Sequence, residues 1–128
     1  MSYYFSKIVD FSFEETIAKV TEELKKEGFG ILTEIDVTAT LKKKLDVDFR
    51  KYKILGACNP PFAYQALLSE RMIGAMLPCN LIVQEAEGGK IEVAAVDPMA
   101  SMQAVPNLKL GELAVEVRAK LQKVIESV

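Results

Sequence analysis

The chain has 128 residues, of which 50% are hydrophobic and 27% are charged. This length and composition predict one soluble globular domain that can bury a core without metal ions or disulfides. The net charge of −2 argues against a dedicated nucleic-acid-binding protein, because such proteins usually carry a basic balance or a basic stripe.

The chain contains no histidine, and this excludes several classes of site. Ser-His-Asp and Cys-His catalytic pairs cannot form within it, and neither can a metal site that uses imidazole. Its two cysteines are too few for a closed thiolate site without carboxylates or a second subunit. The GxGxxG and GxxxxGK[ST] motifs, which bind dinucleotides and phosphates, are absent as well. The sequence therefore predicts no metal and no cofactor.

The longest apolar stretch, residues 72–83, is interrupted by Gly74, Pro78 and Asn80. It falls short of the roughly 20 residues that a membrane-spanning helix needs. The N-terminus also lacks the basic and apolar regions of a secretory signal. We therefore expect a cytoplasmic protein with no membrane partner, in which thiols are kept reduced.

The first half of the chain predicts three strands and two helices. Residues 2–9 are rich in aromatic and β-branched side chains, which is typical of a strand. Ser12 and Glu15 form a capping box for an amphipathic helix over residues 13–27, which Gly28 ends. Residues 29–37 alternate like a strand with one buried face. Thr38 can cap a short helix over residues 39–45, and residues 50–58 form a third strand.

In the second half, Asn59 and Pro60 suit the first positions of a helix that extends to about residue 69. Residues 77–87 and 90–97 predict two strands joined by a tight turn. A loop follows, and Asn107 can cap a last amphipathic helix that extends to residue 128. The order β-α-β-α-β-α-β-β-α predicts an α/β (α+β) domain in which helices pack on a mixed sheet of about five strands.

Several stretches resemble the domain of unknown function 302 family of small bacterial and archaeal proteins. They are Gly28-Phe29-Gly30, LTEIDVTATLKKKL, LGACNPPFAYQAL, Gly74, Leu77-Pro78-Cys79 and Asp97-Pro98. The resemblance extends through nearly the whole chain, so residues 1–128 are expected to form a single domain of this type. It implies a two-layer α/β domain that often associates as a dimer, and it implies no established activity.

The two cysteines are the first candidates for chemistry. Cys58 is expected at the end of a strand and directly before a helix N-terminus, where the helix dipole lowers a thiol pKa. Cys79 follows Pro78 and is expected to begin the next strand, so the two thiols could form a redox pair if these strands are neighbours. The alternative is that both cysteines are small buried apolar side chains.

Two acidic residues and a basic cluster are further candidates. Glu34 and Asp36 are two apart on a strand, so their carboxylates would share a face, either as a functional pair or as a solvated surface. Alternatively, Asp36 helps to start the following helix. The basic cluster could bind a phosphorylated ligand or nucleic acid, although two aspartates interrupt it, which favours a solvated face. It consists of Lys42, Lys43, Lys44, Arg50, Lys51 and Lys53.

We therefore predict a ligand-binding or accessory module that acts as a homodimer, with an unknown small molecule as its ligand and no nucleic-acid or membrane partner. One alternative is a thiol-dependent redox protein or enzyme, and another is a structural interaction domain. The candidate catalytic residues are Cys58 and Cys79, and the candidate ligand-binding residues are Asn59, Pro78, Glu34 and Asp36.

Overall fold

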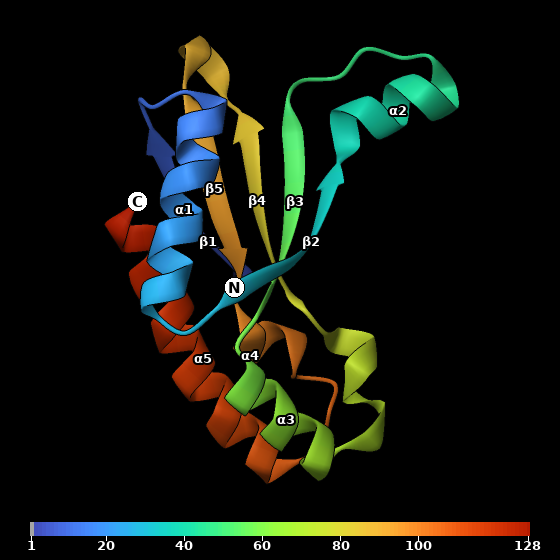
Figure 1. Ribbon diagram of the computed structural model, residues 1–128. Helices are drawn as coiled ribbons and strands as arrows, with labels where there is room; N and C mark the ends of the chain where they lie inside the picture. The colour runs from blue at the N-terminus through green and yellow to red at the C-terminus, as the bar shows by residue number, and fades with distance from the viewer. Residues whose placement is uncertain (1) are drawn as a thin grey trace.

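The computed structural model describes residues 2–128 and shows a five-stranded sheet with helices packed on it (Figure 1). The strands are β1 (Tyr4–Val9), β2 (Gly30–Asp36), β3 (Tyr52–Cys58), β4 (Cys79–Glu85) and β5 (Ile91–Val96). The helices are α1 (Phe13–Lys26), α2 (Val37–Leu45), α3 (Pro60–Ser69), α4 (Pro98–Ser101) and α5 (Leu108–Ser127), with short 3-10 helices η1 (Arg71–Met76) and η2 (Glu87–Gly89). The predicted α/β class and the number of strands are confirmed. The loop predicted after β5 contains the one-turn helix α4.

The strands follow the order β1-β5-β4-β3-β2, and every neighbouring pair is antiparallel. This corrects the predicted mixture of parallel and antiparallel pairs. The helix α1 carries the chain from one edge strand to the other, so β1 and β2 run in the same direction but never pair. The other helical connections join neighbouring strands of opposite direction, so they are long hairpin connections and not crossovers.

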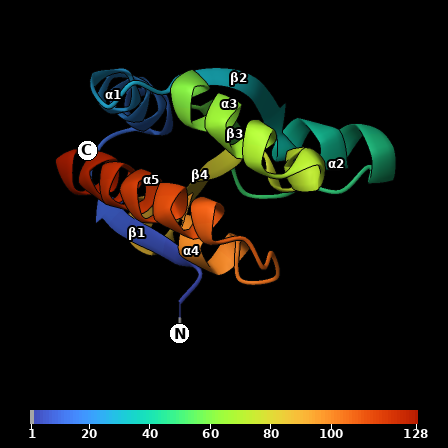
Figure 2. The ribbon, with the colours of Figure 1, turned by 90° about the horizontal axis from the view of Figure 1, so that it is seen from below.

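The helices α1 and α5 cover one face of the sheet, which we call the inner face (Figure 2). Cross-strand pairs such as Leu55 with Leu81 and Val83 with Val93 are fully buried there. Burying such a side chain contributes about 1.5 to 3 kcal/mol. The helices add apolar residues to the same core, among them Val20, Leu24, Leu121, Val124 and Ile125.

The local signals that predicted α1 are present in the structure. The Ser12 side chain accepts a hydrogen bond from the Glu15 backbone N–H, and the Glu15 carboxylate accepts one from the Ser12 N–H. Gly28 follows the helix with a positive φ of 85°, a conformation that glycine adopts without strain. The predicted range for this helix is therefore confirmed to within one residue.

Two charged side chains attach α5 to the sheet. Lys7 in β1 donates hydrogen bonds to the backbone carbonyls of Glu126 and Val128, at 3.0 and 2.6 Å, where the helix ends. Such carbonyls lack intrahelical partners, and a cation is favourable beside them. Arg118 donates to the buried Asp97 carboxylate at 3.2 Å, and the other carboxylate oxygen caps α4 by accepting from the Met99 N–H.

The expectation that β2 buries one of its faces is wrong. Leu32 and Ile35 are 68% and 49% exposed, and only Phe29, just before the strand, is fully buried. The strand lies at the edge of the sheet, where it has one neighbouring strand instead of two. A β-bulge between Ile31 and Thr33 also changes the direction in which the intervening side chain points.

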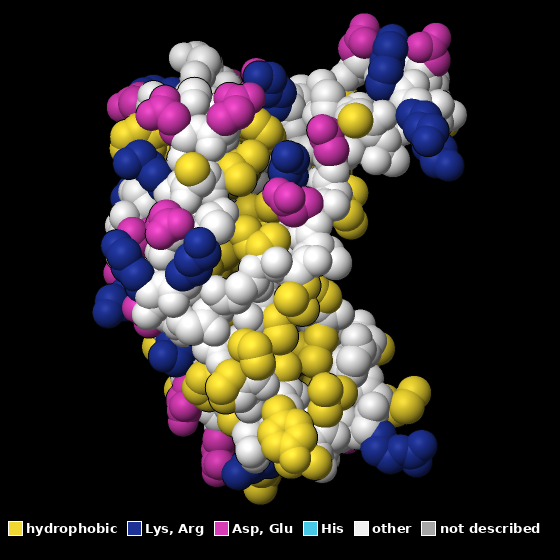
Figure 3. All heavy atoms as spheres, in the orientation of Figure 1, with side chains coloured by type: hydrophobic (Ala, Val, Ile, Leu, Met, Phe, Trp, Pro, Cys, Tyr) yellow, Lys and Arg dark blue, Asp and Glu magenta, His cyan; other side chains and the backbone are white. Residues whose placement is uncertain are grey.

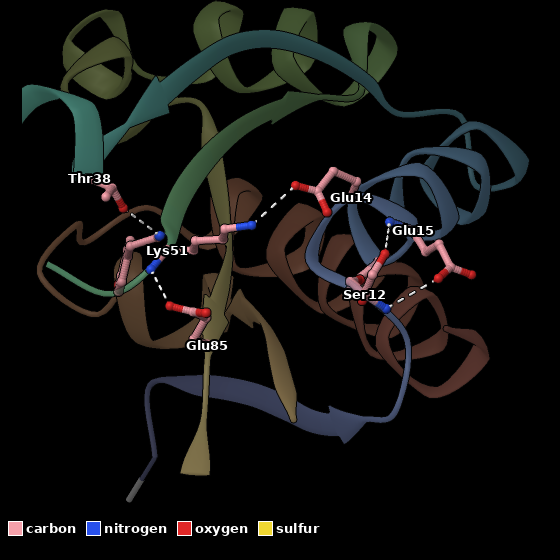
Figure 4. A network of polar contacts seen from close by, with 8 residues as sticks. Ser12, Glu14, Glu15, Thr38, Lys51 and Glu85 are labelled. Atoms are coloured by element: carbon pink, nitrogen blue, oxygen red, sulfur yellow. Dashed lines mark hydrogen bonds and ion pairs between the residues drawn. The ribbon is translucent and has the colours of Figure 1, made fainter. Parts of the chain in front are cut away.

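The helix α2 begins earlier than predicted. Asp36 is its N-cap, since the Asp36 carboxylate accepts a hydrogen bond from the Ala39 N–H at 2.9 Å. Thr38, the predicted cap, lies inside the helix and instead links it to β3. Its hydroxyl accepts from the Tyr52 N–H at 2.9 Å and donates to the Arg50 carbonyl (Figure 4). None of the nine residues of α2, all described, is buried, and the helix projects from the body as an arm (Figure 1).

Gly56 in β3 occupies a position that has no space for a side chain. A Cβ atom there would collide with the Thr33 hydroxyl and lie 2.8 Å from Pro78 Cγ. Gly30 in β2 is a matched control, because a Cβ atom there would meet nothing within 4 Å.

We expect Gly56→Ala to lower the free energy of unfolding by roughly 1 to 3 kcal/mol, because overpacking forces neighbouring groups to move. Gly30→Ala should leave it unchanged or raise it by about 0.5 kcal/mol, because alanine restricts the unfolded chain. Urea unfolding of both variants measures the difference. An equal loss of stability in the two variants would contradict this account of Gly56.

Candidate functional site

A cavity of about 340 Å³ lies where the sheet ends, between β3, β4, α3 and α5. Cys58, Asn59, Pro78 and Cys79, which the sequence predicted to surround a ligand site, all line it. They come together because β3 and β4 are antiparallel neighbours, with Ala57 opposite Cys79. The end of one strand and the start of the next are therefore adjacent in space.

The cavity walls are almost entirely apolar. Of the lining residues that the structure describes, none is Lys, Arg, Asp or Glu, and the hydrogen-bonding side chains are Thr33, Asn59 and the two thiols. Apolar side chains also gather on the surface around α3, in the lower part of Figure 3. The apolar wall consists of Phe29, Leu32, Ala57, Phe62, Ala63, Ala66, Leu67, Leu77, Pro78, Pro98, Met102, Leu110, Leu113, Ala114 and Val117.

The helix α3 forms one side of this cavity, and it carries no charged residue. Of its ten residues, all of which are described, only Ala66 is buried. Tyr64 and Leu68 are 62% and 65% exposed, so the helix is apolar toward the solvent as well as toward the cavity. A helix that is apolar all round is normally covered by other parts of a structure. The outer side of α3 is therefore an exposed apolar surface next to the cavity.

Asn59 connects the cavity to the turn between α1 and β2. It is at the N-cap position of α3, as predicted, but its side chain makes no capping hydrogen bond. Instead its Nδ2 donates to the Glu27 carbonyl at 3.2 Å, and a Cβ atom on Gly28 would lie 3.2 Å from the same nitrogen. Only 8% of Asn59 is exposed. The residue therefore holds the start of α3 against the end of α1.

Both cysteines are free and partly buried, and they lie on neighbouring strands. Burial raises the pKa of the Cys79 thiol to about 11, and the nearby Cys58 thiol adds to this effect. At neutral pH Cys79 is therefore protonated, and a protonated thiol is a poor nucleophile. This does not favour Cys79 as a resolving thiol, and it is compatible with an apolar role in the cavity wall.

Glu34 and Asp36 do not line the cavity that holds the cysteines. Glu34 is exposed, and the Asp36 carboxylate accepts a hydrogen bond from the Ala39 N–H at the N-terminus of α2. Asp36 does line a second hollow of about 520 Å³, between α1 and the arm, where basic and acidic side chains balance. There Lys42 pairs with Asp46 and Asp48.

The basic cluster also contains Lys51, whose amino group lies 3.5 Å from the Glu14 carboxylate of α1 (Figure 4). The pKa of Glu14 is lowered, first by a backbone hydrogen bond and then by the Lys51 charge. The Lys51 backbone N–H donates to Glu85 at 2.7 Å. These contacts favour the interpretation of the cluster as a solvated face, in which Lys51 also joins the start of β3 to α1.

Sequence reasoning missed the apolar residues on the helical side of the cavity, such as Phe62, Ala66, Leu113 and Ala114. Small and aliphatic residues at helical spacing look the same whether they face a core or a cavity. One signal was available in the sequence, because residues 54–69 contain no charge at all. A surface helix usually carries charges on its outer side.

Across residues 2–128, no group of three or more Cys, Asp or Glu side chains is arranged to hold a metal ion. None of the helices in that range has both the length and the apolar character required to cross a bilayer.

The fold and the cavity define a two-layer α/β domain with an apolar pocket at one end of an antiparallel sheet. The chain belongs to the family described as domain of unknown function DUF302, whose model matches residues 5–128. It is similar to the crystal structure of an uncharacterized conserved DUF302 protein from Bacillus stearothermophilus, with a TM-score of 0.91 and 30% identity. That match covers 99% of this chain and 98% of the other. A search of curated proteins found no significant match.

The raised pKa of Cys79 predicts slow alkylation at neutral pH. In a Cys58→Ser variant, only Cys79 remains to react. Relative to the ordinary thiol pKa of 9.0, a value of about 11 lowers the thiolate fraction at pH 7 roughly a hundredfold. The rate of reaction with iodoacetamide should therefore be low at pH 7 and should still increase between pH 9 and 11.

The Cys79→Ser variant retains only Cys58, so its alkylation rate under the same conditions gives the reactivity of Cys58 for comparison. Rapid alkylation of Cys79 at pH 7, at the rate of an unfolded control, would contradict the neutral, buried state of this thiol.

Proposed function

We propose that this protein is a binding module for a small, uncharged, mainly apolar molecule, and that the cavity between β3, β4, α3 and α5 is its binding site. The observation that carries this proposal is a cavity of about 340 Å³ whose wall is apolar and contains no ionised side chain among the described residues. Its volume falls within the range of roughly 300 to 1,000 Å³ that is typical of small-molecule sites.

The wall chemistry limits the charge of the ligand. A carboxylate or ammonium group that enters this cavity would lose its hydration without gaining an ion-pair partner, and that loss is costly. A neutral apolar ligand loses little, because it replaces water or empty space next to apolar side chains. The neutral Cys79 thiol is consistent with such a ligand.

Two alanines of α5 provide a matched test of this site. Ala114 lines the cavity and is 5% exposed, whereas Ala119 lies on the exposed side of the same helix. Wild type should bind neutral N-phenyl-1-naphthylamine more tightly than anionic 8-anilinonaphthalene-1-sulfonate, as measured by probe fluorescence. Ala114→Phe fills the cavity and should weaken binding of the neutral probe at least about tenfold, which corresponds to 1.4 kcal/mol. Ala119→Phe should bind it like wild type.

Near-UV circular dichroism verifies that both phenylalanine variants keep native tertiary packing. Failure of wild type to bind the neutral probe, or an equal loss of binding in the two variants, would refute this site.

We further propose that the module acts as a homodimer through the outer face of the sheet, the face opposite α1 and α5. In a solvated antiparallel sheet this face should be polar. Here a row of cross-strand partners places Ile35, Ile54, Ile82 and Ala94 side by side on it.

The β1 edge of the outer face is apolar as well, since Tyr4 and Ile8 are 44% and 49% exposed. The face also carries Arg50 and Glu92, side chains of opposite charge, which are linked through Gln84 by hydrogen bonds of 3.0 and 2.9 Å. A surface that carries both signs can complement a second copy of itself about a two-fold axis. These features support the proposal that a second copy of the chain covers the outer face.

Ile82→Lys places a charge at the centre of the outer face and should convert a dimer into a folded monomer. Leu45→Lys, on the exposed side of the α2 arm, is the control and should leave the dimer intact. Sedimentation velocity measures the oligomeric state, and far-UV circular dichroism verifies the fold. A monomeric wild type, or the same change in both variants, would count against this interface.

A further inference from the structure

We propose that the ligand of this cavity is a molecule with an apolar body and one neutral hydrogen-bond donor, a hydroxyl or an N–H, which donates to Oδ1 of Asn59. This inference rests on the proposed binding function of the cavity. It names the chemical class of the ligand and the residue that selects it.

The hydrogen bonds of Asn59 identify the group that remains free. A side-chain amide offers two N–H donors and one carbonyl acceptor. Its Nδ2 is fixed toward the turn after α1, because the Glu27 carbonyl is an acceptor and can pair only with the nitrogen. Within residues 2–128, Oδ1 accepts no hydrogen bond, and the side chain does not cap α3.

The burial of Asn59 indicates where its Oδ1 lies. Asn59 is only 8% exposed and lines the cavity. In the described part of the chain, no fully buried side-chain nitrogen or oxygen lacks a hydrogen-bond partner. The unpartnered Oδ1 must therefore keep some accessible surface, and the cavity is the space that Asn59 borders. An acceptor in such an apolar environment gains from a donor supplied by a ligand.

The other polar groups of the wall are weaker candidates for this role. Thiols such as Cys58 and Cys79 are poor hydrogen-bond partners. Thr33 is exposed, so a ligand would only replace water at its hydroxyl. A hydrogen bond to the nine-tenths buried Asn59 therefore discriminates more strongly between ligands than a bond to Thr33.

The acceptor and the uncharged wall together define the ligand class. Ethers, ketones and hydrocarbons fit the wall but cannot donate to Oδ1. Ammonium groups can donate, but they find no carboxylate among the lining residues that the structure describes. Alcohols, phenols and neutral N–H compounds satisfy both conditions, since each adds a donor without adding a charge.

The experiment compares 2-naphthol with 2-methoxynaphthalene, which has the same ring system and oxygen atom but no donor. Dissociation constants are measured at pH 7, where the naphthol is neutral, by the intrinsic fluorescence of each probe. The ratio of the two constants reports the hydrogen bond, because general changes in the cavity affect both probes. A hydrogen bond of this kind contributes about 0.5 to 1.5 kcal/mol, so Asn59→Leu should shift the ratio against naphthol roughly threefold to tenfold.

Thr33→Val is the matched control, because it removes the other hydroxyl of the wall while keeping the shape of the side chain. It should leave the ratio at the wild-type value. Asn59→Leu also removes the bond to Glu27, so its thermal stability is measured in parallel. A stability loss alone does not shift the ratio, since both probes bind the same folded fraction.

The outcomes separate the two proposals. If neither probe binds wild type, both the binding function and this inference fail. If both probes bind and Asn59→Leu leaves the ratio unchanged, the cavity binds apolar molecules but Asn59 does not select a donor. A shift of the ratio in Thr33→Val instead of Asn59→Leu would assign the hydrogen bond to Thr33 and overturn the inference.

Discussion

The difference in length between α5 and the strands determines much of this structure. A helix of 20 residues is about 30 Å long, whereas strands of six or seven residues measure roughly 20 to 24 Å. The C-terminal half of α5, with Leu121 and Val124, lies in the core against the sheet. Its N-terminal half extends past the end of the sheet, where Leu110 joins Ala66 and Ile73 in a second, smaller apolar cluster. The cavity lies between these two clusters.

This geometry also sets the surroundings of the two cysteines. They stand where β3 ends and β4 begins, so the apolar side chains of α3 and α5 surround them. Burial raises the pKa of Cys79 and so disfavours its thiolate, and the chain has no histidine that could accept a proton from a thiol. The same apolar surroundings underlie the proposal that this cavity binds a neutral molecule.

The sequence predicted features that depend on neighbours along the chain. The Ser12 and Glu15 capping box and the start of α3 at Asn59 are local signals of this kind. Whether Cys58 and Cys79 are close stayed open in the sequence, because it depends on the pairing of β3 with β4. The cap of α2 was misassigned because Asp36 and Thr38 are both good capping residues, and contacts with β3 decide which one caps the helix. The antiparallel pairing of the strands and the helical side of the cavity depend on which distant segments become neighbours in space. The spacing of apolar residues along a helix does not predict those neighbours.

The arm formed by α2 contributes less to the stability of the domain than the other helices do. None of its nine residues is buried, so it contributes little to the cooperative folding unit. Neither apolar cluster contains a residue of α2, so local opening of the arm would leave both clusters intact.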